Sequence, residues 1–124
     1  MGVRLMATPR RRVPVSDGEA ALAAWKDGDT SRNTIATAVR FSLEELTSRA
    51  PGNSVEVRVP PFGVAQCVEG PRHTRGTPPN VIECDGGTWL GLVSGTLEWA
   101  DAVSQAKLSA SGSRADLSEH LPLL

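Results

Sequence analysis

Hydrophobic positions in the first half of the chain predict two consecutive helices. An alanine-rich run follows the capping signature Ser16-Asp17-Gly18-Glu19, which predicts a helix that ends at Gly28. In the next segment, small or apolar residues recur every three or four positions, which predicts an amphipathic helix over about 31–49. The positions of this stripe are Ile35, Ala38, Val39, Ser42, Leu43 and Leu46. Pro51 and Gly52 then end the helix.

After residue 53 the pattern changes from a helical period to strict alternation. Val55, Val57 and Val59 fall on one side of the chain, which predicts a strand with one buried face. The sequence Pro60-Pro61-Phe62-Gly63 predicts a turn into a second strand over 64–69, paired with the first as a hairpin. Residues 70–79 are rich in Gly and Pro and predict a loop, followed by a third strand over 81–84.

The last third of the chain contains the signals of two short helices. Asp85 is a suitable cap for a helix that ends at Gly95, because its carboxylate can accept backbone N–H groups. Thr96 is the predicted cap of the next helix. Trp89 and Leu92 are apolar positions of the first helix, and Trp99 and Val103 are apolar positions of the second.

The C-terminal residues predict one more strand and one more helix. Residues 108–111 form the predicted strand, and residues 113–116 resemble a capping box for a helix in which Leu117 and Leu121 share a face. Strands therefore cluster instead of alternating with long helices. This order predicts an α+β fold with a mostly antiparallel sheet of four to five strands and helices packed on one face.

Length and charge limit the classes of protein that this chain can be. A chain of 124 residues with 40% apolar residues predicts one globular domain that buries its own core. The 13 basic and 14 acidic residues leave a net charge of -1, which argues against nucleic acid as a partner. Residues 1–15 carry four Arg and no acid, and we interpret them as a flexible basic arm before a domain over 16–124.

Targeting signals are weak along the chain. The longest uncharged, largely apolar stretch is 86–97, which is shorter than the ~20 residues that cross a bilayer. We therefore expect no stable membrane insertion. Charged residues and Pro interrupt the N-terminal region, unlike a secretory signal, and the expected location is cytoplasmic. The pattern leaves the oligomeric state open.

Catalytic motifs are absent from the sequence. It has no nucleophile elbow, no phosphate-binding Gly-rich loop and no Cys-x-x-Cys. His73 and His120 are far apart in sequence and are not accompanied by other residues at the spacing of a zinc site. We therefore expect no cofactor, no metal and no enzymatic activity. Cys67 and Cys84 lie in predicted strands and are interpreted as small buried residues. A thiol-dependent enzyme that uses one of them is an alternative, and it requires an exposed thiol of low pKa.

The best polar candidates for a binding role lie in the loop over 70–79. Arg72, His73 and Arg75 offer charged donors for a phosphate or a carboxylate headgroup. The alternative is a solvated basic turn.

The best apolar candidates lie on the predicted C-terminal helices. If these helices leave space against the sheet, their apolar side chains would line a cavity for an apolar ligand. The alternative is an ordinary core. The candidates are Trp89, Leu92, Trp99, Val103, Leu117 and Leu121.

The C-terminal part also resembles a known family. Residues 85–97 resemble the pattern of the sterol carrier protein type 2 domain, in which a strand leads to a capped helix with an aromatic residue, a Leu and a Gly. Residues 108–113 and 117–124 are similar to the last strand and the terminal Leu-rich helix of that domain. Residues 59–63 and 70–80 resemble its short bacterial branch, found in actinobacteria.

The resemblance covers about residues 16–124 and carries an expectation of function. It implies a non-catalytic carrier or binding domain for a fatty acyl chain or another lipid, held in an internal hydrophobic cavity. An alternative is a ligand-free accessory or protein-interaction domain, because similar domains are appended to enzymes.

Overall fold

The computed structural model describes residues 12–70 and 80–124 and confirms the predicted α+β fold. Residues 1–11 of the predicted arm and the loop residues 71–79 lie outside the described residues. Among those described, helices and strands follow one another in nearly the predicted order. They are α1 (Val15–Lys26), α2 (Arg32–Arg49), β1 (Val55–Val59), β2 (Gly63–Cys67), β3 (Asn80–Cys84), α3 (Gly86–Ser94), α4 (Trp99–Ser104), β4 (Leu108–Ser111) and the 3-10 helix η1 (Ser118–His120).

The four described strands form one sheet in the order β2-β1-β3-β4. The pairs β1–β2 and β3–β4 are antiparallel and the central pair β1–β3 is parallel, so the sheet is mostly antiparallel. The predicted hairpin is confirmed, and the Phe62 N–H donates to the Val59 carbonyl at 2.8 Å in its turn. The register places Val57 between Ala65 and Ile82, on one face of the sheet.

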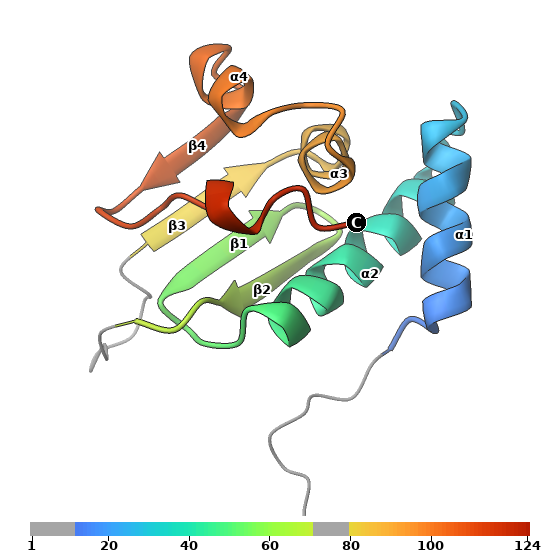
Figure 1. Ribbon diagram of the computed structural model, residues 1–124. Coiled ribbons are helices and arrows are strands. Elements are labelled where there is room, and N and C mark those ends of the chain that lie inside the picture. Colours follow the sequence, from blue (N-terminus) through green and yellow to red (C-terminus); the bar gives the residue numbers. More distant parts are fainter. Residues whose placement is uncertain (1–11, 71–79) are drawn as a thin grey trace, which may run out of the picture.

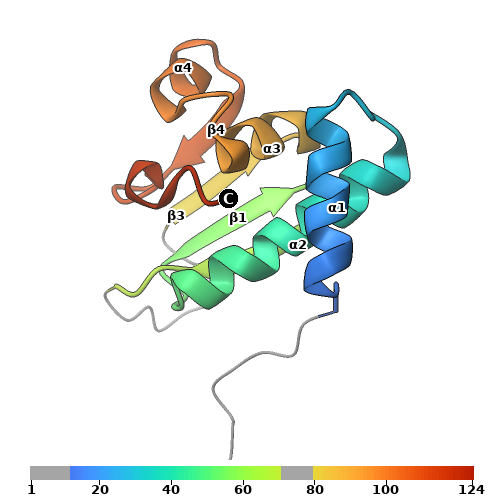
Figure 2. The same cartoon turned by 45° about the vertical axis from the view of Figure 1, so that its right-hand side comes forward.

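Helices cover one face of this sheet. Figures 1 and 2 show α2 and α3 lying over the sheet, with α1 on the outer side of α2. The alternation of β1 explains the two faces, since Val55, Val57 and Val59 are buried while Glu56 and Arg58 keep partial exposure on the other side. The core therefore lies between the helices and one sheet face. No helix among the described residues is long and apolar enough to cross a membrane.

The contact between α1 and α2 depends on a glycine. A Cβ added at Gly18 would lie 2.1 Å from the Phe41 ring, so only glycine allows this approach. The predicted cap at Ser16 is wrong, because α1 begins at Val15 with Pro14 before it and no side-chain cap. The Pro14 carbonyl accepts the Gly18 N–H at 3.0 Å, which starts the helix earlier.

Two predicted helix boundaries near the C-terminus are also wrong. The helix expected after Thr96 begins only at Trp99, because the Leu97 N–H donates to the Gly91 carbonyl at 3.0 Å and folds this stretch back onto α3. The final helix is reduced to the three residues of η1. In its place the Asp116 carboxylate accepts the Ser118 N–H at 2.8 Å, and Leu121 is extended.

Local capping signals elsewhere are confirmed. The Asp85 carboxylate accepts the Thr88 N–H at 2.7 Å at the start of α3. Gly95 ends α3 with a left-handed φ of 84°. Asp85 and Gly95 thus set the two ends of α3, which follows the carboxyl end of β3 and carries the candidates Trp89 and Leu92.

Candidate functional site

The structure brings most of the predicted apolar candidates together between the helices and the sheet. Trp89, Leu92 and Leu117 are buried members of the hydrophobic core. Trp99 and Leu121 are partly buried and pack against that core. Val103 lies on α4 with 50% of its surface exposed, so the structure does not bring it into this layer.

Trp89 is held in the layer by a buried hydroxyl. Its indole N–H donates to Ser42 Oγ at 2.8 Å, and Ser42 Oγ donates to the Val39 carbonyl at 2.9 Å. Every polar atom of this chain of bonds has a partner although the side chains are fully buried. Sequence reasoning placed Ser42 on the apolar stripe but missed this role. A lone hydroxyl on a buried helix face is the signal that could have revealed it.

The last residues of the chain cover the same layer, and we call residues 117–124 the C-terminal segment. Leu117 and Leu123 are buried, and Figures 1 and 2 show the segment crossing the helical side of the sheet. The N–H groups of Leu123 and Leu124 donate to the Val93 carbonyl at 2.9 and 3.0 Å. Arg49 Nη1 donates to the Leu123 carbonyl. The end of the segment is therefore tied to both α2 and α3.

A buried amide anchors the chain just before the C-terminal segment. Asn80, at the start of β3, donates through Nδ2 to the Ser54 carbonyl at 2.8 Å. Its Oδ1 accepts the Arg114 N–H at 2.8 Å. Asn80 thus links β1, β3 and the approach to the segment. Sequence reasoning missed it, because nothing local to Asn80 indicates a partner more than thirty residues away.

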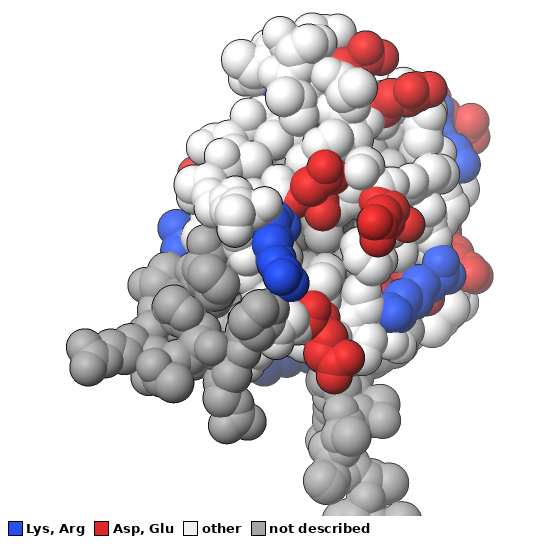
Figure 3. All heavy atoms as spheres, turned by 60° about the vertical axis from the view of Figure 1, so that its left-hand side comes forward, with Lys and Arg blue, Asp and Glu red and all other residues white. Residues whose placement is uncertain are grey.

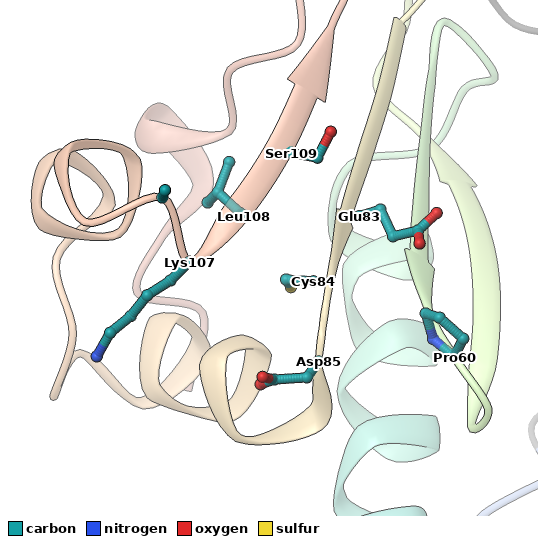
Figure 4. Close-up of a pocket in the computed structure, with 8 residues that line it drawn as sticks. Pro60, Glu83, Cys84, Asp85, Lys107, Leu108 and Ser109 are labelled. Atoms are coloured by element: carbon teal, nitrogen blue, oxygen red, sulfur yellow. The ribbon is translucent and has the colours of Figure 1, made fainter.

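A pocket of about 400 Å³ lies at the opposite end of β3. In Figure 4, the Cys84 side chain lies between β3 and β4, while Asp85 and Lys107 extend to the same side of β3. Glu83 points to the other side, toward Pro60. The pocket is lined by Pro60, Glu83, Cys84, Asp85, Ala106, Lys107, Leu108 and Ser109. The sequence did not predict it, because its lining comes from three separate segments.

Both thiols are buried, which contradicts the requirement of the thiol-enzyme alternative. Burial raises the pKa of Cys67 to about 11. Burial, together with the charges of Asp85 and Glu83, raises the pKa of Cys84 to about 12. A nucleophilic cysteine needs the opposite environment, in which positive charge stabilises an exposed thiolate.

Charged side chains of both signs share the surface. Figure 3 shows a face on which acidic and basic groups adjoin one another. Two ion pairs, Arg58–Glu56 and Arg49–Glu45, illustrate this local balance. The described part of this face lacks the uniformly basic surface typical of nucleic-acid binding.

The structure does not locate the predicted headgroup residues. Arg72, His73 and Arg75 lie outside the described residues, so their anion-binding role stays a prediction. Within residues 12–70 and 80–124, no group of three His, Cys, Asp or Glu side chains is placed to hold a metal ion.

Comparison with known proteins matches the chain to a protein family. The sequence model of a family described as "Bacterial SCP ortholog" matches residues 31–123. The match runs from the start of α2 through most of the C-terminal segment and leaves out α1. No curated protein matches the chain.

Proposed function

We propose that this chain, which belongs to the bacterial sterol carrier protein (SCP) orthologues, binds or carries an apolar ligand such as a fatty acyl chain or another lipid. One observation carries the proposal. The matched region holds a continuous apolar layer between helices and sheet, and all of the predicted apolar contact residues except Val103 lie in it or pack against it. The role is that of a non-catalytic binding domain.

The physical basis is transfer of an apolar tail out of water. Each buried methylene contributes ~0.8 kcal/mol, so a long acyl chain gains enough to offset the ordering of the ligand. Trp89, Leu92 and Leu117 are already buried by protein, so an incoming tail must replace protein contacts. The C-terminal segment is the part best suited to yield, because its regular structure is limited to the three residues of η1.

Lipid extraction and titration test the proposal. Purified protein is extracted with organic solvent, and the extract is analysed by mass spectrometry. Delipidated protein is then titrated with fatty acids while tryptophan emission is followed, since Trp89 and Trp99 lie in or against the layer. We expect co-purifying lipid and saturable binding. Absence of both contradicts the proposal.

A second candidate is a ligand-free accessory or protein-interaction domain. The observation that favours it is the packing of the layer, in which Trp89 and Leu117 have no exposed surface. The two candidates differ in thermal unfolding, because a ligand that binds only the folded state raises the melting temperature. An unchanged melting temperature across saturating fatty acids and single-chain lipids favours the second candidate.

A further inference from the structure

The two edges of the sheet differ in how the rest of the chain covers them. Strand β2 forms one edge and β4 forms the other. Helix α2 reaches over the β2 edge, because Thr47 Oγ1 donates to the Gln66 carbonyl at 3.4 Å and the Val68 N–H donates to the Ala50 carbonyl at 2.7 Å. Residues 109–113, in and after β4, are all exposed, and Figure 1 shows β4 at the margin of the sheet. Among the described strands, β4 therefore offers the edge that a further strand can join.

The sequence of β4 lacks most of the features that protect an exposed edge. Natural edge strands are commonly blocked by charged residues, by Pro or by a bulge. Residues 108–113 are Leu-Ser-Ala-Ser-Gly-Ser and contain neither a charge nor Pro. The pairing with β3 is continuous from Leu108 to Ser111, so this strand has no bulge. Its short length is the remaining protection, and it limits the strength of any pairing.

The layer that covers the helical face of the sheet ends before it reaches β4. Ala110 is the register partner of Ile82 and shares its face, yet Ile82 has no exposed surface while Ala110 is exposed. Figure 4 shows that Leu108 and Ser109 point to opposite sides of β4, so Ser109 lies on the uncovered face of the sheet. A strand placed beside β4 would meet an open backbone and small side chains on both faces.

We propose that β4 is a self-association edge, at which two copies of this chain pair antiparallel around a two-fold axis and join their sheets. With Ala110 on the axis, Ser109 of one copy lies opposite Ser111 of the second copy. Residues near such an axis meet themselves or close neighbours, so a single charge there would repel its own copy. The uncharged β4 satisfies this symmetry, and facing Ser hydroxyls can form hydrogen bonds. The inference does not depend on the proposed lipid-binding function.

The same comparison of edges sets the size and strength of the assembly. Pairing consumes both β4 edges, and α2 covers the β2 edges, so association stops at two copies instead of growing into a filament. Strand β4 has four residues, whereas a standard interface uses ~20–30 residues on each side. We therefore expect a weak and reversible dimer that forms as the protein concentration rises.

Sedimentation velocity of the full chain, over a series from micromolar to millimolar concentration, measures the dimer. Two double variants test the register. Ser109→Lys with Ser111→Glu places opposite charges in both facing pairs, and Ser109→Lys with Ser111→Lys places like charges there. Both variants share the change beside Glu83, the register partner of Ser109, so they differ only at position 111. We expect the first to tighten the dimer about two- to fivefold per pair and the second to weaken it by a similar factor.

A charge-matched control addresses the other edge. Val64→Lys with Gln66→Lys places two charges on exposed positions of β2 and should leave the dimer as in the parent. Circular dichroism and melting temperature establish that each variant is folded. Hydrogen exchange by mass spectrometry should slow at residues 108–112 as the parent protein is concentrated.

Three results would overturn the proposal. The chain could stay monomeric throughout the series, or it could grow into assemblies larger than a dimer. The third is a dimer that the two β4 variants change equally, or that the β2 control weakens as much as they do. A dimer that responds to the sign of the charge at position 111, and that ignores the β2 control, supports the pairing of β4 with a second copy.

Discussion

Two regions cover the same face of the sheet in different ways. Helix α2 has 18 residues, buries a continuous stripe and is fixed to α3 through Ser42 and Trp89. The C-terminal segment has one short 3-10 helix and is held at its end by Val93 and Arg49. We therefore expect α2 to act as a fixed wall of the apolar layer and the C-terminal segment, with less regular structure, to act as a cover that is easier to displace.

Truncating one leucine in each region should give the largest difference. Leu46→Ala in α2 is expected to lower the free energy of unfolding by about 3 to 5 kcal/mol, because the rigid helix cannot move to fill the cavity that the substitution leaves. Leu123→Ala should cost about 2 kcal/mol, the transfer contribution alone, because the C-terminal segment can shift inward. Urea unfolding measures both values. Equal losses would contradict the distinction between wall and cover.

Helix α1 packs against the outer side of α2 at Gly18, where the Phe41 ring closely approaches the α1 backbone. Gly18→Ala should destabilise the protein by about 1 to 3 kcal/mol, because the new methyl group overlaps the Phe41 ring. Gly87→Ala is the matched control in α3, where an added Cβ would lie 3.8 Å from the Asp85 carboxylate oxygen, an ordinary contact distance. It should stabilise by up to about 1 kcal/mol, since alanine favours a helix. Opposite signs in urea unfolding are the expected result, and a stabilising Gly18→Ala would show that α1 packs loosely.

The hydroxyl between α2 and α3 gives the next effect. Ser42→Ala leaves the buried Trp89 indole N–H without its acceptor and should cost about 1 to 3 kcal/mol. Ser48→Ala, on the exposed face of α2, should stay within about 0.5 kcal/mol of the parent. Thermal unfolding and tryptophan emission measure the pair. A neutral Ser42→Ala would mean that α3 is not held by this bond.

The contrast between α2 and the C-terminal segment also separates the structure that the sequence could predict from the structure that it could not. Helix α2, β1 and the cap of α3 follow from periodicity and from signals within a few residues, such as Asp85 and Gly95. The course of the chain after β4 depends on Asn80 and Val93, which are distant in sequence, so local capping signals failed there. Most predicted site residues do lie in the apolar layer, but the pocket was missed because separate segments build its lining.

Removing one anchor of the C-terminal segment should have a smaller effect on stability. Arg49→Ala removes the donor to the Leu123 carbonyl, and we expect faster hydrogen exchange at Leu123 and Leu124 with a global loss of ~1 kcal/mol. Glu45→Gln breaks the Arg49–Glu45 ion pair but keeps the Arg49 guanidinium, so it is the matched control. Hydrogen exchange by mass spectrometry distinguishes the two variants. Equal exchange in both would show that Arg49 does not hold the C-terminal segment.

The smallest effect on stability is expected at Asp116, just before the C-terminal segment, and it depends on pH. Hydrogen bonds from Ser118 lower the pKa of Asp116 from its ordinary value of 3.8. The folded state therefore favours the ionised carboxylate. The resulting contribution of Asp116 to folding stability is fully present above pH 3.8 and is lost as the pH falls through the lower pKa of the folded state. Asp116 is well exposed, so Asp116→Asn should cost well under ~1 kcal/mol at neutral pH and nothing in strong acid.

Urea midpoints of both proteins across the acid range check this expectation. Glu69→Gln, at another exposed position, controls for the change in net charge. The difference between Asp116→Asn and the parent should close as the pH falls below 3.8, because the parent side chain then loses the same charge. A difference that persists in acid would mean that Asp116 acts through the shape of its turn. Acid would then not make the C-terminal segment easier to displace. The weak attachment of this segment would come only from its short helix and its few anchoring hydrogen bonds.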